Sequence, residues 1–161
     1  MKTPFTDLYF AALPTDEPIG TLDCAARMDE INAAKSQKAK REKYFVWRLL
    51  TYALQKSVGA VAAAPQIKKE SYGGWSAGDV FISLSHSGGA LAVAVSSETI
   101  GIDVESLCHL KQIKIAERIL CDEELAEFEK LPQGQHRERL VEIWTAKEAI
   151  FKSKCISQFL P

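Results

Sequence analysis

The stretch Val80-Phe81-Ile82-Ser83-Leu84-Ser85 is followed by His86-Ser87-Gly88-Gly89 and then by Ala90-Leu91-Ala92-Val93-Ala94-Val95. The first and third segments are apolar runs of strand length, and the segment between them consists of residues that favour turns. Another apolar run, Thr99–Glu105, follows after a short gap. Three short runs with tight connections predict an antiparallel meander.

The rest of the chain adds one strand before the meander and helices on both sides of it. Asp7–Leu13 is typical of a first strand, and apolar residues at helical spacing predict a helix over 28–58. From Lys111 onward the pattern is again helical, with a break at Pro132-Gln133-Gly134 and a last helix over Gln135–Lys154. The order strand, helix, three strands, helices predicts an α+β fold.

Composition limits the class of protein. The chain has 161 residues, 47% of them hydrophobic and 25% charged, which is typical of one globular domain. The net charge of −1 disfavours a nucleic-acid binder, and no apolar run reaches the ~20 residues of a membrane span. The N-terminal residues do not resemble a secretion signal. No CxxC pair occurs among Cys24, Cys108, Cys121 and Cys155, so we expect reduced thiols and a cytoplasmic protein.

Charge is segregated along the chain although its sum is close to zero. The segment 35–48 is basic, with Lys35, Lys38, Arg41 and Arg48 among its cations, whereas 122–129 is acidic. Such segments are usually solvated helix faces, but they can also meet an anion and a basic partner.

Two carboxylates share one side of the third predicted strand, Gly101-Ile102-Asp103-Val104-Glu105. Because side chains on a strand alternate between its faces, Asp103 and Glu105 point the same way while Ile102 and Val104 point into the core. Paired carboxylates repel each other unless a positive charge lies between them, and a hard divalent cation with oxygen ligands would supply it. A solvent-facing strand end is the alternative interpretation of this motif alone.

Two further motifs carry chemistry. The first is Trp144-Thr145-Ala146-Lys147-Glu148-Ala149-Ile150-Phe151-Lys152, where the last helix places Glu148 and Lys152 on one side. The two residues form either a surface ion pair, or a third metal-binding carboxylate beside a cation that binds phosphate. In Ser85-His86-Ser87, adjacent side chains point apart and no Gly-x-Ser-x-Gly elbow is present, which excludes a serine nucleophile. A turn histidine or a phosphate-binding histidine remain as interpretations.

The three motifs together, in this order, resemble the signature of the 4′-phosphopantetheinyl transferase superfamily. That signature is a Ser-His-Ser strand end, a Gly-[Ile/Val]-Asp-[Ile/Val]-Glu strand, and Trp-x-x-Lys-Glu-[Ala/Ser]-x-x-Lys on a later helix, and residues 83–152 match each part. The roughly one hundred residues before the second motif are similar to the larger, Sfp-type branch of the superfamily.

The resemblance implies an activity. Such enzymes transfer the 4′-phosphopantetheine arm of coenzyme A to a serine of an acyl or peptidyl carrier protein. Asp103, Glu105 and Glu148 would hold Mg²⁺ on the pyrophosphate. Either Glu148 or Glu124 would accept the hydroxyl proton. The remaining phosphate contacts would come from Lys147, Lys152, Ser85, His86, Arg41 and Arg48, the last two at the 3′-phosphate, with Lys35 and Lys38 as weaker candidates there.

The resemblance also has two departures. The Gly-Lys-Pro that often precedes the first motif is replaced by Tyr72-Gly73-Gly74-Trp75, so we expect Trp75 to stack on adenine. Sfp-type members continue beyond the last helix into further strands, which this sequence does not show.

We therefore expect a single domain, 1–161, with an N-terminal half over 1–100 and an incomplete, truncated second pseudo-symmetric half over 101–161. Leu140, Ile143, Trp144 and Phe151 share a face of the last helix, and without further strands we expect a homodimer to cover it. A non-catalytic homologue that binds coenzyme A or a carrier protein is the alternative function.

Overall fold

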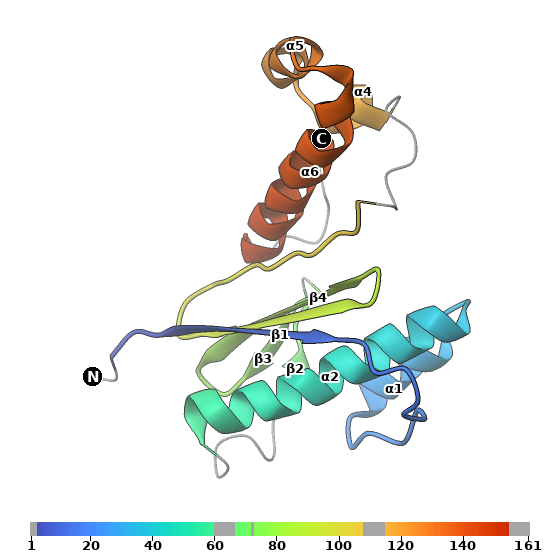
Figure 1. The fold of residues 1–161 in the computed structure, drawn as a ribbon. Coiled ribbons are helices and arrows are strands. Elements are labelled where there is room, and N and C mark those ends of the chain that lie inside the picture. The colour runs from blue at the N-terminus through green and yellow to red at the C-terminus, as the bar shows by residue number, and fades with distance from the viewer. Residues whose placement is uncertain (1–2, 60–66, 72, 108–114, 155–161) are drawn as a thin grey trace.

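The computed structural model of the chain describes residues 3–59, 67–71, 73–107 and 115–154. Among these residues, five strands form one antiparallel sheet in the order β1-β5-β4-β3-β2, with helices on both sides of it (Figure 1). The predicted α+β fold with an antiparallel sheet is confirmed. The strands are β1 (Thr6–Ala12), β2 (Ile67–Lys69), β3 (Trp75–Ala77), β4 (Val80–Ser87) and β5 (Ala90–Ser96). The helices are α1 (Ala25–Asn32), α2 (Gln37–Val58), α4 (Ala116–Ile119), α5 (Asp122–Glu129), the short 3₁₀ helix η2 (Gln133–Gln135) and α6 (His136–Ser153).

The β4–β5 hairpin contains the first two strands of the predicted meander. Gly88 and Gly89 form its two-residue turn with φ of 60° and 89°, and Ser87 pairs with Ala90. Positive φ at both central residues is the type I′ geometry, whose twist matches that of the flanking strands. A glycine at each position therefore fixes the register of the hairpin.

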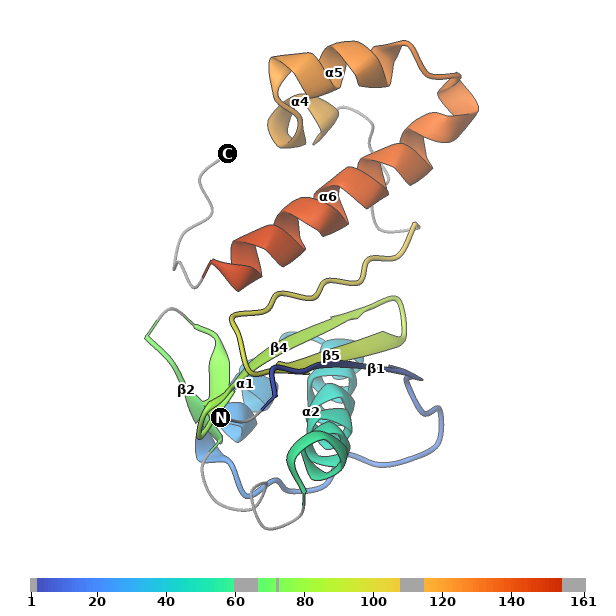
Figure 2. The same ribbon diagram turned by 90° about the vertical axis from the view of Figure 1, so that its left-hand side faces the viewer.

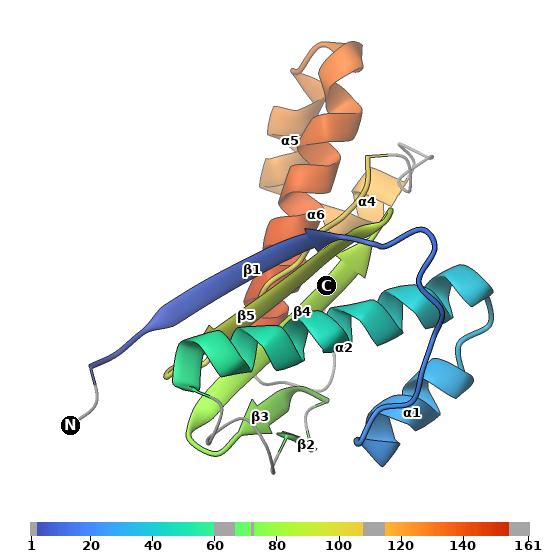
Figure 3. The same cartoon turned by 60° about the horizontal axis from the view of Figure 1, so that its bottom comes forward.

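Helix α2 covers one face of the sheet (Figures 1 and 3). Its stripe of apolar residues packs on β4 and β5, and Val46, Leu50 and Leu54 are completely buried against residues such as Val93 and Val95. This is the face that helical spacing predicts. Burial of such side chains stabilises the fold by ~1.5–3 kcal/mol each.

The helix predicted over 28–58 is in fact two helices, α1 and α2. The hydroxyl of Ser36 accepts a hydrogen bond from the N–H of Ala39 at 3.1 Å and so caps α2. Because an N-cap residue needs extended backbone, a continuous helix through Ser36 would lose this bond. Ala33 and Lys35 favour helices, which is why apolar spacing alone missed the break.

The third strand predicted over 99–105 runs in an extended path beneath α6, but it does not belong to the sheet (Figure 2). Ile102 is buried against Ala92 and Ala94, with Val104 packed beside it, so the predicted alternation of faces holds. The segment is fixed to β4 by serine side chains and not by backbone pairing, as described below.

The C-terminal helices form a second apolar cluster. Phe128 of α5 and Leu140 of α6 are buried together with residues of α4, and Ile143 and Trp144 pack on them. Phe151, expected on the same face, instead lines a cavity beside the sheet. Within the described part of the chain, no helix is both long and apolar enough to cross a membrane. Cys24 and Cys121 are free thiols, whereas Cys108, Cys155 and Tyr72 lie outside the described residues, as do the beginning of the helical region at Lys111 and the last seven residues of the chain.

Candidate active site

Serine hydroxyls along β4 hold the segment 101–106 in place. Side chains two residues apart on β4 face this segment, and each accepts a backbone N–H from it. The bonds measure 3.0, 3.1 and 3.3 Å and run from Ile102, Val104 and Ser106 to the hydroxyls of Ser83, Ser85 and Ser87. A hydroxyl can accept one hydrogen bond while it donates another, which a backbone carbonyl cannot do. Each of these serine hydroxyls therefore still has a proton that it can donate to a carboxylate.

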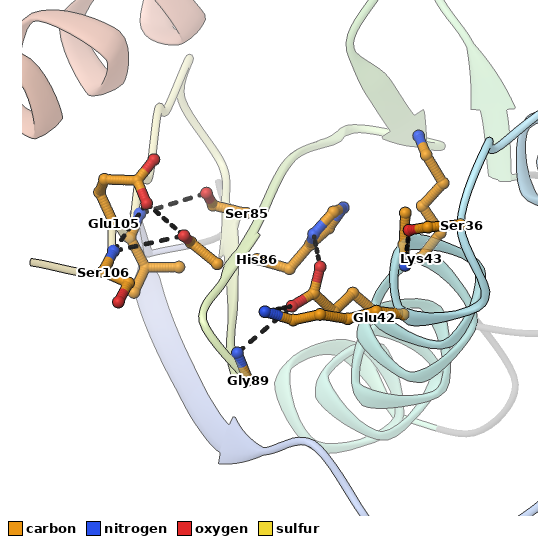
Figure 4. Close-up of polar contacts among 12 residues, drawn as sticks. Ser36, Glu42, Lys43, Ser85, His86, Gly89, Glu105 and Ser106 are labelled. Carbon is orange, nitrogen blue, oxygen red and sulfur yellow. Dashed lines mark hydrogen bonds and ion pairs between the residues drawn. The ribbon is translucent and has the colours of Figure 1, made fainter. Parts of the chain in front are cut away.

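Those protons go to the two predicted carboxylates. The hydroxyl of Ser85 donates to Oδ1 of Asp103 at 2.8 Å, and that of Ser87 donates to Oε1 of Glu105. Figure 4 shows Glu105 beside Ser106. Oε1 of Glu105 also accepts the N–H of Ser106 at 2.7 Å. Strand β4 thus fixes both the backbone and the side-chain direction of Asp103 and Glu105.

Gly101 lets α6 come close to this segment. A Cβ at residue 101 would lie 1.8 Å from the carbonyl oxygen of Ala149 and 2.7 Å from the backbone nitrogen of Ser153. Both are backbone atoms of one helix, so they cannot move aside singly. The absence of a side chain at Gly101 is what allows Glu148 and Lys152 of α6 to reach the carboxylates.

Lys152 lies directly on Asp103. Its Nζ is 2.6 Å from Oδ1 of Asp103 and also donates to the carbonyl of Ile102 at 3.3 Å and the hydroxyl of Ser85 at 3.4 Å. The superfamily resemblance implied a phosphate contact for Lys152 and a Mg²⁺ ion beside Asp103. In the structure the ammonium group supplies the positive charge that Asp103 requires.

The predicted residues meet in a cavity of about 310 Å³. Its walls contain Ser85, His86, Asp103, Glu105, Trp144, Glu148 and Lys152. Burial raises the pKa of Glu148; the charge of Lys152 opposes this, and that of Asp103 adds to it. A cavity that raises a carboxyl pKa near a second carboxylate is a common feature of functional sites.

A second cavity, of about 330 Å³, adjoins the first and shares His86 and Lys152 with it. It also contains Arg27, Lys43 and Trp75. Strand β3 pairs with β4 only as far as Ile82, so within the described residues the edge of β4 beyond Ile82 borders this space. The cavity therefore combines cations, an indole and an open strand edge.

Aromatic packing holds Trp75 in the wall of the second cavity. Trp75 is 5% exposed and stacks edge-on against Trp47, with ring centroids 4.7 Å apart, and the Arg27 guanidinium lies over Trp47. Burial lowers the pKa of Lys43, and the charge of neighbouring Arg27 lowers it further. The carboxylate of Glu30, which pairs with Arg27 at 2.7 Å in the same cavity, opposes this repulsion, and a bound anion would relieve what remains.

Comparison with known proteins agrees with the motifs. Residues 99–160 match the model of the 4′-phosphopantetheinyl transferase superfamily. The predicted resemblance is confirmed. A 4′-phosphopantetheinyl transferase, gsp, of Aneurinibacillus migulanus is 29% identical to this chain over 83 residues, which are 52% of this chain and 35% of that relative. The chain therefore spans about a third of the relative's length. The superfamily match contains Asp103, Glu105, Glu148 and Lys152, while Ser85 and His86 precede it.

Four residues assigned by the superfamily resemblance lie outside both cavities. Lys147 pairs with Glu124 at 2.5 Å and donates to the carbonyl of Ile119 at 2.7 Å, which ties α6 to α5 and α4. Arg41 donates to backbone carbonyls of residues 14–17, and Arg48 pairs with Glu17.

Lys43 and Arg27 are cations of the second cavity that the sequence motifs did not indicate. Lys43 belongs to the basic segment 35–48 and lies four residues before Trp47, whose burial was not foreseen. Helical spacing from a buried aromatic residue would have pointed to it. Nothing in the spacing of Arg27 indicated a role.

The carboxylates fit a magnesium ion in their chemistry. Among the described residues, no three carboxyl, imidazole or thiol groups converge closely enough to hold a metal ion alone. Mg²⁺ in phosphoryl-transfer sites is usually held by one or two carboxylates together with substrate phosphates and water. Oxygen donors beside a phosphate-sized cavity meet that requirement.

Proposed function

We propose that this chain is a Mg²⁺-dependent 4′-phosphopantetheinyl transferase that moves the phosphopantetheine arm of coenzyme A to a serine of an acyl or peptidyl carrier protein. One observation carries the proposal: the cavity that gathers Ser85, His86, Asp103, Glu105, Glu148 and Lys152 from β4, the extended segment and α6. The superfamily match supports the reaction class.

In this reaction the carrier serine oxygen bonds to the β-phosphorus of coenzyme A while the bond from that phosphorus to the bridging oxygen breaks. Adenosine 3′,5′-bisphosphate leaves. Catalysis of phosphoryl transfer is mostly positioning and neutralisation of charge. A bound Mg²⁺ would supply neutralisation at the pyrophosphate, and we assign Asp103, Glu105 and Glu148 as the residues that would hold it.

Lys152 is assigned to a phosphate oxygen. Its Nζ is already in the cavity, where it pairs with Asp103. An ammonium group that can turn from a carboxylate to a phosphate stabilises the added negative charge of the transition state.

Glu148 is the better of the two candidate proton acceptors. It lines the cavity that also contains Asp103 and Lys152. Glu124 lies on α5, and its hydrogen bond from Lys147 lowers its pKa. We therefore assign the serine proton to Glu148, directly or through a water.

The second cavity suits the nucleotide. Lys43 and Arg27 supply cations, and His86 lies where the two cavities meet. Arg41 and Arg48, on the neighbouring surface, remain candidates for the 3′-phosphate and for steering an acidic carrier protein. Free thiols at Cys24 and Cys121 fit a reducing, cytoplasmic setting.

The alternative function is that of a homologue that binds coenzyme A or a carrier protein without transfer. The Lys152–Asp103 ion pair favours it, since a lysine already neutralises one assigned metal ligand. The transferase and a homologue that binds coenzyme A both require coenzyme A binding in the cavities.

Calorimetric titration with coenzyme A tests the shared requirement. We expect binding that tightens in Mg²⁺ and weakens when Lys152 is changed to Ala, with Lys154→Ala as a control. Lys154 ends α6 and is exposed. No binding by the unmodified chain would overturn the transferase and leave only a homologue that binds a carrier protein.

A further inference from the structure

Strand β4 sends its functional side chains to two faces. Ser85 and Ser87 face the carboxylates of the extended segment, while His86, between them, faces α2 (Figure 4). The partner of His86 on α2 is Glu42, a residue that no motif singled out. Glu42 is only 7% exposed, which is unusual for a carboxylate in an apolar helix face.

Glu42 uses its two oxygens differently. Oε1 accepts the N–H of Gly89 in the hairpin turn at 3.3 Å, and Oε2 lies 3.4 Å from Nδ1 of His86. Lys38 approaches only from the rim, at 3.9 Å. The carboxylate is therefore fixed by the turn and directed at the imidazole.

Nδ1 of His86 is buried and makes no hydrogen bond within the described residues. A buried polar atom without a hydrogen bond is costly. The nearest charged group to Nδ1 on α2 is Oε2 of Glu42, 3.4 Å away. A proton on Nδ1 faces a carboxylate. Nε2 is then the nitrogen that meets a ligand in the cavities that His86 lines.

We propose that Glu42 is a positioning residue that holds the proton of His86 on Nδ1, so that an anion bound at Nε2 draws a second proton onto the ring. This inference rests on the proposed function for the identity of the anion, a phosphate of coenzyme A. The proton comes from solvent, so binding takes up as much as one proton, and the imidazolium lies between the carboxylate and the phosphate.

The charged groups around the imidazole of His86 determine its protonation in the protein without a ligand. Burial lowers the pKa of His86; Glu42 opposes this, and Lys43 and Arg27 lower it further. Lys152, from α6, lines the same cavities. Without a ligand the ring is neutral near pH 7. When a phosphate also binds beside the imidazole, two anions lie next to it, and together they favour the charged, doubly protonated form of His86.

Glu42→Gln separates this role from a structural one. The amide keeps an oxygen acceptor for Gly89 N–H but loses the charge. Glu129→Gln, at the exposed end of α5, removes the same charge away from the site. Nitrogen-detected NMR of the free protein reports the tautomer and titration of His86, whose signals are assigned by their loss in His86→Gln.

In the unmodified chain and in Glu129→Gln we expect neutral His86 to carry its proton on Nδ1. In Glu42→Gln that preference should be lost and the His86 titration should move down by about one pH unit. Glu42→Asp, which keeps the charge, should restore part of the shift. Unchanged tautomer and titration in a folded Glu42→Gln would overturn the proposal and leave Glu42 only as an anchor for the hairpin.

Titration with coenzyme A in two buffers of different ionisation enthalpy counts the protons. We expect proton uptake by the unmodified chain near pH 7, and in Glu42→Gln less uptake and about tenfold weaker binding that improves at lower pH. Equal uptake in both would contradict the coupling. If coenzyme A does not bind the unmodified chain, the proposed function fails, while the NMR result still decides whether Glu42 sets the proton of His86.

Discussion

Lys43 and Arg48 lie five residues apart on α2 and have different surroundings. Lys43 lines the second cavity and is partly desolvated, whereas Arg48 is half exposed and pairs with Glu17. The superfamily resemblance assigned the 3′-phosphate to Arg48, and the cavity favours Lys43. A hydrogen bond to a charged group contributes ~1.5–3 kcal/mol, and an exposed ion pair less.

We therefore predict that Lys43→Ala weakens coenzyme A by about tenfold and 3′-dephospho-coenzyme A much less, because only the former carries the extra phosphate. Arg48→Ala should affect both ligands slightly and equally. Calorimetry on the four pairs provides the measurement. The reverse pattern would return the clamp to Arg48.

Glu148 gives a prediction for stability against pH. Its pKa is raised in the folded protein, so ionising it costs the fold free energy as pH rises from the unfolded pKa through the higher folded one. In chelator at pH 7, Glu148→Gln should be at least as stable as the unmodified chain, and the difference should vanish in acid, below the unfolded pKa. Urea denaturation at both pH values is the measurement. A variant clearly less stable at pH 7 would mean that the charge of Lys152 outweighs burial.

At the scale of elements, the approach of α6 to the extended segment depends on Gly101. We predict that Gly101→Ala displaces α6, lowers the free energy of unfolding by about 1–3 kcal/mol and abolishes transfer, since Glu148 and Lys152 leave Asp103. Gly134→Ala is the matched control, because a Cβ there meets nothing within 4 Å. Denaturation and transfer assays on both variants provide the measurement. If the two variants behave alike, the role of Gly101 is refuted.

The contacts of Ser83, Ser85 and Ser87 with the segment 101–106 show which parts of the site could be predicted from the sequence. Period-two alternation placed Asp103 and Glu105 on one side and Ile102 and Val104 on the other, and this depends only on extended backbone. That hydroxyls of β4 would replace a backbone ladder was not visible, because Ser83 reads as an ordinary strand residue. Likewise, the Glu42–His86 contact joins residues far apart in the chain, and helical periodicity says only that Glu42 interrupts an apolar face.

At the scale of the whole molecule, the covering of α6 is partly internal. Leu140 is buried and Trp144 packs against α4 and α5, so the face expected to require a partner already has one within the chain. Among the described residues, the exposed large apolar side chains are those of Leu8 and Phe10 on β1, an edge strand of the sheet, of Tyr52 on α2, of Leu107, and of Ile150 on α6. Exposed apolar groups at a sheet edge favour association.

The homodimer expected from the sequence stays a prediction. Light scattering at micromolar concentration should give twice the mass of one chain, and Ile150→Glu should shift it toward the monomer, because a charge is costly in an apolar interface. Phe10→Glu tests the edge strand in the same way. A monomer that binds no apolar dye would refute self-association.

The most direct test of the central claim is a mass measurement on apo carrier proteins incubated with this chain, coenzyme A and Mg²⁺. Fatty-acid, polyketide and peptide-synthetase carriers and a lysine-pathway reductase form the panel. We predict that at least one carrier gains the mass of the phosphopantetheine arm and that a chelator prevents this gain. The Asp103→Ala variant, shown by circular dichroism to be folded, should produce no gain in mass. Carriers of unchanged mass, with coenzyme A bound to the chain, would contradict the transferase and leave the binding homologue.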